Sequence, residues 1–296
     1  MNQPPDPPTP ASGEKAATRS PAIWAVAGGK GGVGRSLLVA NMGIQIARLG
    51  KKVTVADLDF EGANLHTYLG IGAPARSLED LGPEKGESPL ASLLLDTSVS
   101  GLKLLSGPLR PVASSRRGKI LEHFNRQADG LPADLILVDC GSGRGDEVLE
   151  LFRRAAGGIL VATPEPASVE SIFLFMESFL EKSLQEALSA DDREKLDIAR
   201  SLDEGSSGGT SSFRSALERL RAEGESSLVA RVLEARPPPR LRLVLYQLPR
   251  ESDSEIAPVL QSGIEKYFGL QMTSLGCVEY DLSVLQAVQK RKPLSQ

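Results

Sequence analysis

Short apolar runs alternate with amphipathic stretches along most of this chain. An apolar run with no polar face is typical of a strand buried on both sides, and a 3.6-residue period is typical of a helix that packs on such strands. The predicted strands begin at Ala22 and cover 51–59, 101–106, 133–139, 158–163, 242–248 and 272–278. The pattern predicts an α/β fold with a doubly wound, mostly parallel sheet flanked by helices.

Helical patterns fill the intervals between these strands. In the first of them, Val39, Met42, Ile46 and Leu49 share one face, which we expect to pack on the sheet, and Gly50 suits the position just after a helix end. The predicted helices cover 36–49, 115–127, a stretch from Asp146, 167–188, 254–268 and 282–290.

The composition divides the chain into three parts. Residues 1–21 are rich in Pro, Ser, Thr and Ala and carry few large apolar side chains, so we expect a disordered tail. Residues 22–294 are expected to form a single domain. Within it, residues 189–239 shift towards Glu, Arg, Ser and Gly, and we interpret them as a variable helical segment with at least one further helix.

One stretch carries the clearest chemistry, and it reads AIWAVAGGKGGVGRS from Ala22 to Ser36. A strand leads into a glycine-rich loop, and the loop leads into a helix. Glycine lets the backbone curl so that its N–H groups point at an anion, and the free N–H groups of the helix start add to that attraction. The stretch therefore predicts a phosphate site.

Two phosphate motifs fit this loop. Gly29, Gly31 and Gly34 satisfy the dinucleotide pattern G-x-G-x-x-G, with Asp57 at the end of the next strand. The same loop satisfies the P-loop pattern G-x-x-x-x-G-K-[ST], except that Arg35 replaces the lysine. The cations Lys30 and Arg35 and the hydroxyl of Ser36 favour the P-loop. A triphosphate bound with Mg²⁺ needs cations beside its oxygens and a hydroxyl on the metal. An NAD-dependent oxidoreductase remains the alternative from a different class.

The P-loop interpretation assigns roles to particular residues. Ser36, Asp59 and Asp139 are the candidate residues of a Mg²⁺ site, Asp139 through water, and Asp59 is also placed to orient an attacking water. Asp59 and Asp139 stand at the ends of two predicted strands that share the edge of the sheet with the loop. The expected ATP-binding residues are Gly29, Lys30, Gly31, Gly32, Val33, Gly34, Arg35, Ser36 and Leu37.

Charge and cysteine content add little to this picture. The net charge of −4 does not indicate nucleic-acid binding. The two cysteines, Cys140 and Cys277, lack the spacing of a metal or redox motif and suit a reducing compartment. We find no signal-peptide pattern and no long apolar run, so the expected location is the cytoplasm.

The sequence resembles the deviant Walker A ATPases of the MinD/ParA group, whose P-loop carries an extra lysine at the position of Lys30. Three more stretches match that family: VTVADLDFEGANLH from Val53, LILVDCGSG from Leu135 and LVATPEPASVES from Leu160. The last of these, together with SLGCVEYDLSVLQAVQKRKPL from Ser274, is most similar to the FlhG/FleN subgroup, which controls flagellar number.

This resemblance implies an ATP-sandwich homodimer, in which Lys30 reaches the partner's phosphates, and a slow hydrolysis assisted by Asp59. It also implies a protein partner or activator and control of the position or number of a cellular structure. Arg35 departs from the family, so a nucleotide-gated module with impaired hydrolysis is the second alternative. Tyr246 or Gln247 replaces the adenine-reading Asn common in relatives. We do not expect direct membrane binding.

Overall fold

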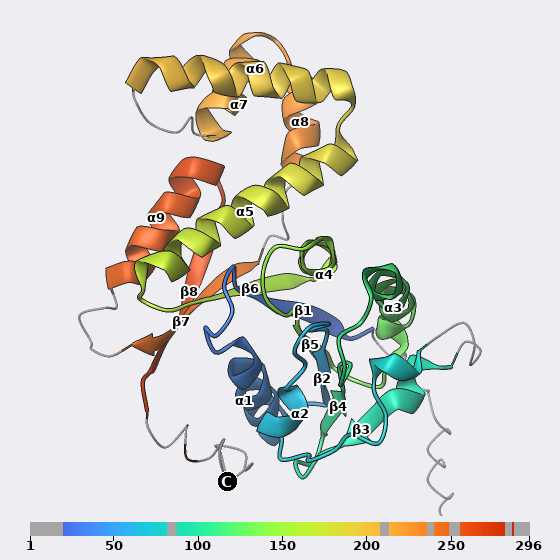
Figure 1. The fold of residues 1–296 in the computed structure, drawn as a ribbon. Helices are drawn as coiled ribbons and strands as arrows, with labels where there is room; N and C mark the ends of the chain where they lie inside the picture. Colours follow the sequence, from blue (N-terminus) through green and yellow to red (C-terminus); the bar gives the residue numbers. More distant parts are fainter. Residues whose placement is uncertain are drawn as a thin grey trace, which may run out of the picture.

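The computed structural model describes residues 20–81, 88–207, 213–235, 240–248, 255–281 and 286. An eight-stranded sheet in the order β3-β4-β2-β5-β1-β6-β7-β8 forms the centre of the molecule (Figure 1). The strands are β1 (Ala22–Ala27), β2 (Val53–Asp57), β3 (Leu94–Asp96), β4 (Leu102–Leu105), β5 (Leu135–Asp139), β6 (Gly157–Ala162), β7 (Leu241–Leu248) and β8 (Met272–Glu279).

Every neighbouring pair of strands is parallel except β3 and β4, which are antiparallel. The predicted mostly parallel α/β sheet is therefore confirmed. The short edge strand β3 was not among the predicted elements. Its three residues are half-buried or exposed, so it lacks the continuous apolar run that marks the central strands.

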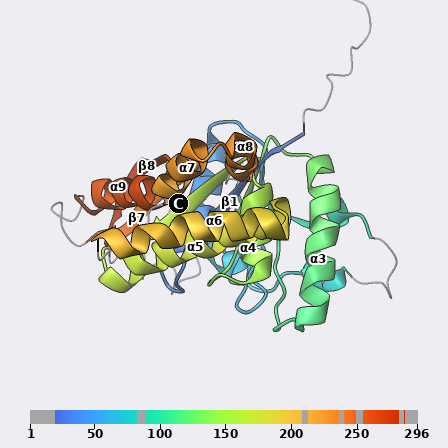
Figure 2. The same ribbon diagram turned by 90° about the horizontal axis from the view of Figure 1, so that it is seen from above.

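Helices cover both faces of the sheet (Figures 1 and 2). One apolar cluster joins α1 and α2 to one face, and a second joins α3, α4, α5 and α9 to the other. The longer helices are α1 (Arg35–Arg48), α3 (Ser114–Gln127), α4 (Asp146–Arg154), α5 (Pro166–Ala187), α6 (Ala190–Ser207), α7 (Phe213–Ala222), α8 (Ser226–Glu234) and α9 (Ile256–Phe268), and α2 (Leu65–Tyr68) is a single turn.

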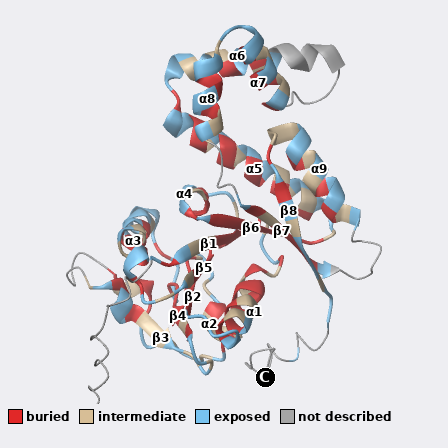
Figure 3. Ribbon diagram, turned by 180° about the vertical axis from the view of Figure 1, so that it is seen from behind, coloured by how far each residue is buried: buried red, intermediate tan, exposed pale blue. Residues whose placement is uncertain are grey.

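Successive residues of the central strands point to opposite faces. In β1, Ala25 and Ala27 belong to the cluster under α4 and α5, whereas Val26 belongs to the cluster under α1. All three are fully buried. Burial on both faces explains the uninterrupted apolar runs of the sequence, and Figure 3 shows the buried residues concentrated in the strands and the adjoining helix faces.

The predicted buried face of α1 is partly wrong. Val39 is fully buried, but Leu49 is 81% exposed and Met42 and Ile46 are only half-buried. Met42 and Ile46 still pack against the cluster that contains Val39, together with the buried Ala40 and Ile44, so the predicted face is wrong only at Leu49. The predicted face omitted small residues such as Ala40, although small side chains allow a helix to lie close to a sheet.

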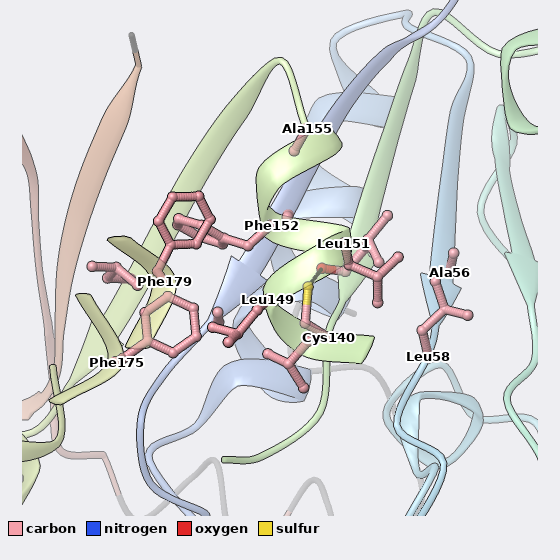
Figure 4. Close-up of a cluster of buried hydrophobic side chains, with 14 of the residues drawn as sticks. Ala56, Leu58, Cys140, Leu149, Leu151, Phe152, Ala155, Phe175 and Phe179 are labelled. Atoms are coloured by element: carbon pink, nitrogen blue, oxygen red, sulfur yellow. Dashed lines mark hydrogen bonds between the residues drawn. The ribbon is translucent and has the colours of Figure 1, made fainter. Parts of the chain in front are cut away.

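Aromatic rings fill the space between α4 and α5 (Figure 4). The ring of Phe152 meets Phe175 edge-on at 5.1 Å between centroids, and it meets Phe179 in the same way at 5.5 Å. Edge-to-face pairs of this kind contribute roughly 0.5–1.5 kcal/mol each beyond the area that they bury. They fix α5 against the body of the protein.

Three helices, α6, α7 and α8, gather at the C-terminal end of α5 (Figures 1 and 2). Their apolar faces form a third cluster with Leu180, Leu184 and Leu188. They occupy most of the predicted variable segment, and we call them the helical unit. Most of the predicted tail, 1–21, and all but residue 286 of the predicted C-terminal helix, 282–290, lie outside the described residues.

Within the part of the chain that the structure describes, no helix combines the length and the hydrophobicity that a membrane span requires.

Candidate nucleotide site

The glycine-rich loop lies between β1 and α1, at the C-terminal edge of the sheet. A cavity of about 550 Å³ opens in front of it. Of the predicted ATP-binding residues, six line this cavity, while Val33 packs into the core beneath the loop. The six are Gly31, Gly32, Gly34, Arg35, Ser36 and Leu37.

Gly29 and Gly34 lie where neighbouring atoms leave no room for a side chain. A Cβ atom on Gly29 would lie 2.0 Å from the carbonyl oxygen of Ser171 in α5, so the loop rests directly on the backbone of that helix. Gly34 has φ +90°, and a Cβ there would lie 2.5 Å from the ring of Tyr246. Only glycine meets both conditions without strain. These two glycines therefore fix the position of the loop.

Arg35 points beneath the loop. Its Nη1 donates hydrogen bonds to the carbonyl oxygens of Lys30, at 2.7 Å, and Gly28, at 3.3 Å. Its Nε lies 3.7 Å from Oδ1 of Asp139, and the side chain is 6% exposed. The guanidinium thus braces the loop from inside. A lysine ammonium could not make this planar set of contacts.

Asp139 is the buried acid of the site. It is the register partner of Asp57 across β5 and β2. Burial raises the pKa of the Asp139 carboxyl, while the charge of Arg35 and a hydrogen bond from Ser36 lower it in part. Its Oδ2 is buried and has no hydrogen-bond partner. A buried, unpartnered carboxylate oxygen beside a serine hydroxyl suits a hydrated Mg²⁺ ion.

Asp57 lies beside Asp139 on the neighbouring strand and is equally buried. It accepts hydrogen bonds from the backbone N–H groups of Leu65, at 2.9 Å, and Asp59, at 3.2 Å. Burial, followed by repulsion from Asp139, raises the pKa of Asp57 to about 8. Through these two hydrogen bonds Asp57 stabilises the turn that follows β2.

Asp59 lines the cavity and is half-buried. Its Oδ1 accepts hydrogen bonds from the backbone N–H groups of Glu61 and Gly62, both at 2.9 Å. This turn fixes the carboxylate in front of the Asp139 loop, since a Cβ on Gly141 would lie 3.1 Å from Cγ of Asp59. The structure thus brings Asp59, Ser36 and Asp139 to one edge of the sheet, as the sequence predicts.

Lys30 does not line the cavity of its own chain. Its Nζ lies 2.9 Å from Oε2 of Glu165, in the turn before α5, and the two side chains are 41% and 64% exposed. A surface ion pair of this kind contributes at most about 1 kcal/mol. Lys30 is therefore held outside its own pocket by a weak contact.

Tyr246 lines the cavity beside Gly34 of the loop and is buried. Gln247, the next residue, has an unusual positive φ of 59°. Sequence reasoning assigned no role to four further residues that line the cavity: Asn64, Tyr68, Ser142 and Tyr280. Asn64 and Tyr68 come shortly after Asp59 in the sequence. This closeness to a predicted site residue could have identified them as lining residues. Ser142 and Tyr280 lie on loops, and no sequence pattern predicts that these loops reach the cavity.

The described residues contain no group of three or more His, Cys, Asp or Glu side chains arranged to hold a metal ion. A metal at this site would therefore depend on Ser36, water and the phosphates of a nucleotide. Such a ligand set suits Mg²⁺, which keeps several waters and takes few protein ligands.

Comparison with known families decides between the two phosphate motifs. Residues 20–180 match the ParA family model, described as NUBPL iron-transfer P-loop NTPase, and this match covers more than half of the chain. The chain belongs to the ParA family of P-loop NTPases. The loop from Gly29 to Ser36 is thus a P-loop and not the dinucleotide fingerprint of an oxidoreductase.

The curated relatives include proteins with different names and roles. The chain is 32% identical over 160 residues to the antiactivator FleN of Pseudomonas aeruginosa, covering 52% of this chain and 55% of the relative. It is 32% identical over 152 residues to the iron-sulfur cluster carrier protein of Bacillus subtilis, covering 50% and 41%. The chain thus spans about half the length of the curated relatives that it matches.

Solved structures share the fold. MinD, a cell division ATPase of Pyrococcus furiosus, superposes with a TM-score of 0.57 and 16% identity, over 93% of this chain and 90% of that chain. MinD of Pyrococcus horikoshii, complexed with Mg-ADP, gives 0.55 and 16%, over 92% and 87%. The MinD-like sheet that the sequence predicts is confirmed at the level of the fold.

Proposed function

We propose that this protein is a MinD/ParA-type regulatory ATPase that switches between a monomer and an ATP-sandwich homodimer. The single observation that carries the proposal is the position of Lys30, which lies at the rim of the site but outside its own cavity. A lysine held there by a weak surface pair is available to the phosphates of a second copy. Partners would then distinguish the two assemblies.

The residues of the cavity suit the binding of ATP with Mg²⁺. The backbone N–H groups of the loop and of the start of α1 would bind the phosphates, and Leu37 would lie beside them. Ser36 would hold the metal directly and Asp139 would hold it through water. When bound, Mg²⁺ neutralises charge on the phosphate oxygens. Asp59 would orient the attacking water, because its carboxylate is fixed by the turn that follows it.

The contacts of Arg35 favour a second candidate function, a nucleotide-gated binding module that hydrolyses ATP very slowly. The hydrogen bonds of Nη1 to Gly28 and Lys30 and the approach of Nε to Asp139 hold the guanidinium beneath the loop. In that position its contacts with the loop compete with any stabilisation of the charge that develops on the γ-phosphate. Both functions use ATP binding and dimerisation, and they differ in turnover.

The names of the relatives suggest which cellular structure this protein acts on. FleN of P. aeruginosa is an antiactivator, and a relative in Helicobacter pylori, 29% identical over 155 residues, is a flagellum site-determining protein. We propose that this chain acts in the cytoplasm through a protein partner on the position or number of a cellular structure, with flagella as the first candidate. Iron–sulfur transport is less well supported, because Cys140 is buried just after β5, whereas Cys277 is exposed on β8.

Turnover by the purified protein tests this proposal. Lys30→Ala should lower ATP hydrolysis at least tenfold and abolish dimer formation with a non-hydrolysable ATP analogue. Lys103→Ala is a matched control, because Lys103 is also 41% exposed and also forms a surface ion pair, with Asp96. Wild-type turnover and dimerisation in the Lys30 variant would refute the cross-subunit role.

A further inference from the structure

A second cavity, of about 510 Å³, lies between α5, α9 and the helical unit. We call it the α5 groove. Figure 1 shows α7 and α9 on the same side of α5. Residues of α5, α6, α7 and α9 line the groove. Its lining runs along α5 from Pro166 to Leu184, a span of about 27 Å at 1.5 Å per helical residue. The groove is separate from the nucleotide cavity.

The lining is mostly apolar. Phe173 packs against two aromatic side chains of α9 that also line the groove, with ring centroids 6.0 Å from Tyr267 and 6.3 Å from Phe268. Leu174 is 36% exposed, although it sits among apolar neighbours. Concave apolar surface of this kind is typical of sites that bind another molecule. The apolar residues used here are Phe173, Leu174, Leu180, Phe213, Tyr267 and Phe268.

A line of negative charge borders the apolar lining. Glu170, Glu177 and Glu181 all line the groove and are exposed. Their spacing of seven and four residues places them on one stripe of α5. None of the three forms an ion pair with a residue that the structure describes. Arg200 of α6 is the cation among the lining residues, so the groove is acidic overall.

We propose that the α5 groove binds an amphipathic helix of a partner protein, with its apolar face on the phenylalanines and leucines and its lysines or arginines opposite the three glutamates. The carboxylates from Glu170 to Glu181 extend over about 16 Å of helix, so their complement is a set of cations with helical spacing. A small apolar ligand would leave them unmatched. Docking of a helix in a groove is a recurrent mode of recognition, anchored at positions i, i+3 or i+4, and i+7.

A synthetic peptide tests the proposal on the full chain without nucleotide. The probe is a fluorescein-labelled helical peptide of leucine and lysine, with leucines on one face. One control peptide has the same composition with the two residues alternating, and the other carries glutamate in place of lysine. Fluorescence anisotropy should give micromolar binding for the probe and at least tenfold weaker binding for both controls. Equal binding of all three peptides would overturn the proposal.

Two variants then locate the binding. The pair Glu177→Lys with Glu181→Lys should weaken the probe at least tenfold, whereas Glu122→Lys with Glu223→Lys, the same charge change elsewhere, should change it less than threefold. Leu174→Glu should also weaken it, whereas Leu49→Glu, at a more exposed position, should not. Unchanged binding in the groove variants would overturn the proposal.

Sedimentation of the free protein distinguishes the competing occupant. A self-association that Leu174→Glu abolishes and Leu49→Glu leaves intact would assign the groove to a second copy of this chain and overturn the proposal. A monomer in all three proteins, with the peptide results above, supports a partner helix. Because no nucleotide is present, these outcomes are independent of the ATPase proposal.

Discussion

The ammonium of Lys30 lies 2.9 Å from a carboxylate oxygen of Glu165, which follows it by 135 residues in the chain. The pair joins the P-loop to the turn that begins α5. Both side chains are substantially exposed, and a pair in that setting contributes about 1 kcal/mol or less. Little free energy is therefore needed to break the contact between Lys30 and Glu165.

Removing Glu165 should release Lys30 and favour the dimer. If the pair competes with the second copy, Glu165→Ala should lower the ATP-analogue concentration needed for half-maximal dimerisation by up to about fivefold, the equivalent of about 1 kcal/mol. Light scattering coupled to gel filtration measures this directly. Asp96→Ala, which removes the partner of Lys103, is the matched control. A Glu165 variant that dimerises less readily than wild type would contradict the competition.

Arg35→Lys should raise turnover at a cost in stability. The lysine loses the hydrogen bonds to Gly28 and Lys30 and frees a compact cation for the phosphates. We expect at least a tenfold gain in phosphate release and a loss of about 1–3 kcal/mol in unfolding free energy for the two lost hydrogen bonds. Phosphate release and denaturant unfolding are measured on the same preparation. Unchanged turnover would remove Arg35 as the cause of slow hydrolysis.

The two kinds of glycine in the loop should respond differently to the same substitution. Gly29→Ala places a methyl group against the backbone oxygen of Ser171, which cannot move without α5, and should cost at least about 2 kcal/mol in stability. Gly31→Ala meets its nearest atom, on Ser142, at 3.9 Å and should cost less than about 1 kcal/mol. Thermal unfolding of the nucleotide-free proteins compares them. Equal losses would show that the loop does not rest on α5.

Ser36→Ala should separate metal binding from nucleotide binding. In the wild type, ATP should raise the midpoint of thermal unfolding more with Mg²⁺ than with EDTA, because only ligands of the folded state stabilise it. The variant retains the backbone donors of the loop, so the rise in EDTA should persist while the additional rise with Mg²⁺ disappears. A full Mg²⁺ effect in Ser36→Ala would exclude its hydroxyl as a metal ligand.

The sheet was predictable because its central strands are buried on both faces. That burial produces continuous apolar runs, of which Val53–Asp57 and Leu135–Asp139 are examples, and each run ends in an acid at the edge where the P-loop lies. The edge strand β3 gives no such pattern, because it is only three residues long and none of them is fully buried. The sequence therefore predicts the centre of the sheet better than its margin.

The parts of the site that consist of residues close together in the sequence were predictable. The loop, Asp59 and Asp139 follow from motifs, because each motif is the end of a strand with its adjoining turn. The direction of the Arg35 side chain was not predictable, because it depends on carbonyl groups that only the folded loop presents. The same holds for Tyr246 above Gly34, a contact between positions more than 200 residues apart.

Helix α5 passes from the P-loop to the helical unit without interruption. Its first turn follows Glu165, the carbonyl of Ser171 supports Gly29, and its last turns enter the apolar cluster with α6, α7 and α8. Over 22 residues it measures about 33 Å and has no internal proline after its first position. Any displacement of the loop against the first turns of α5 would therefore move the helical unit at the far end of the same rigid helix.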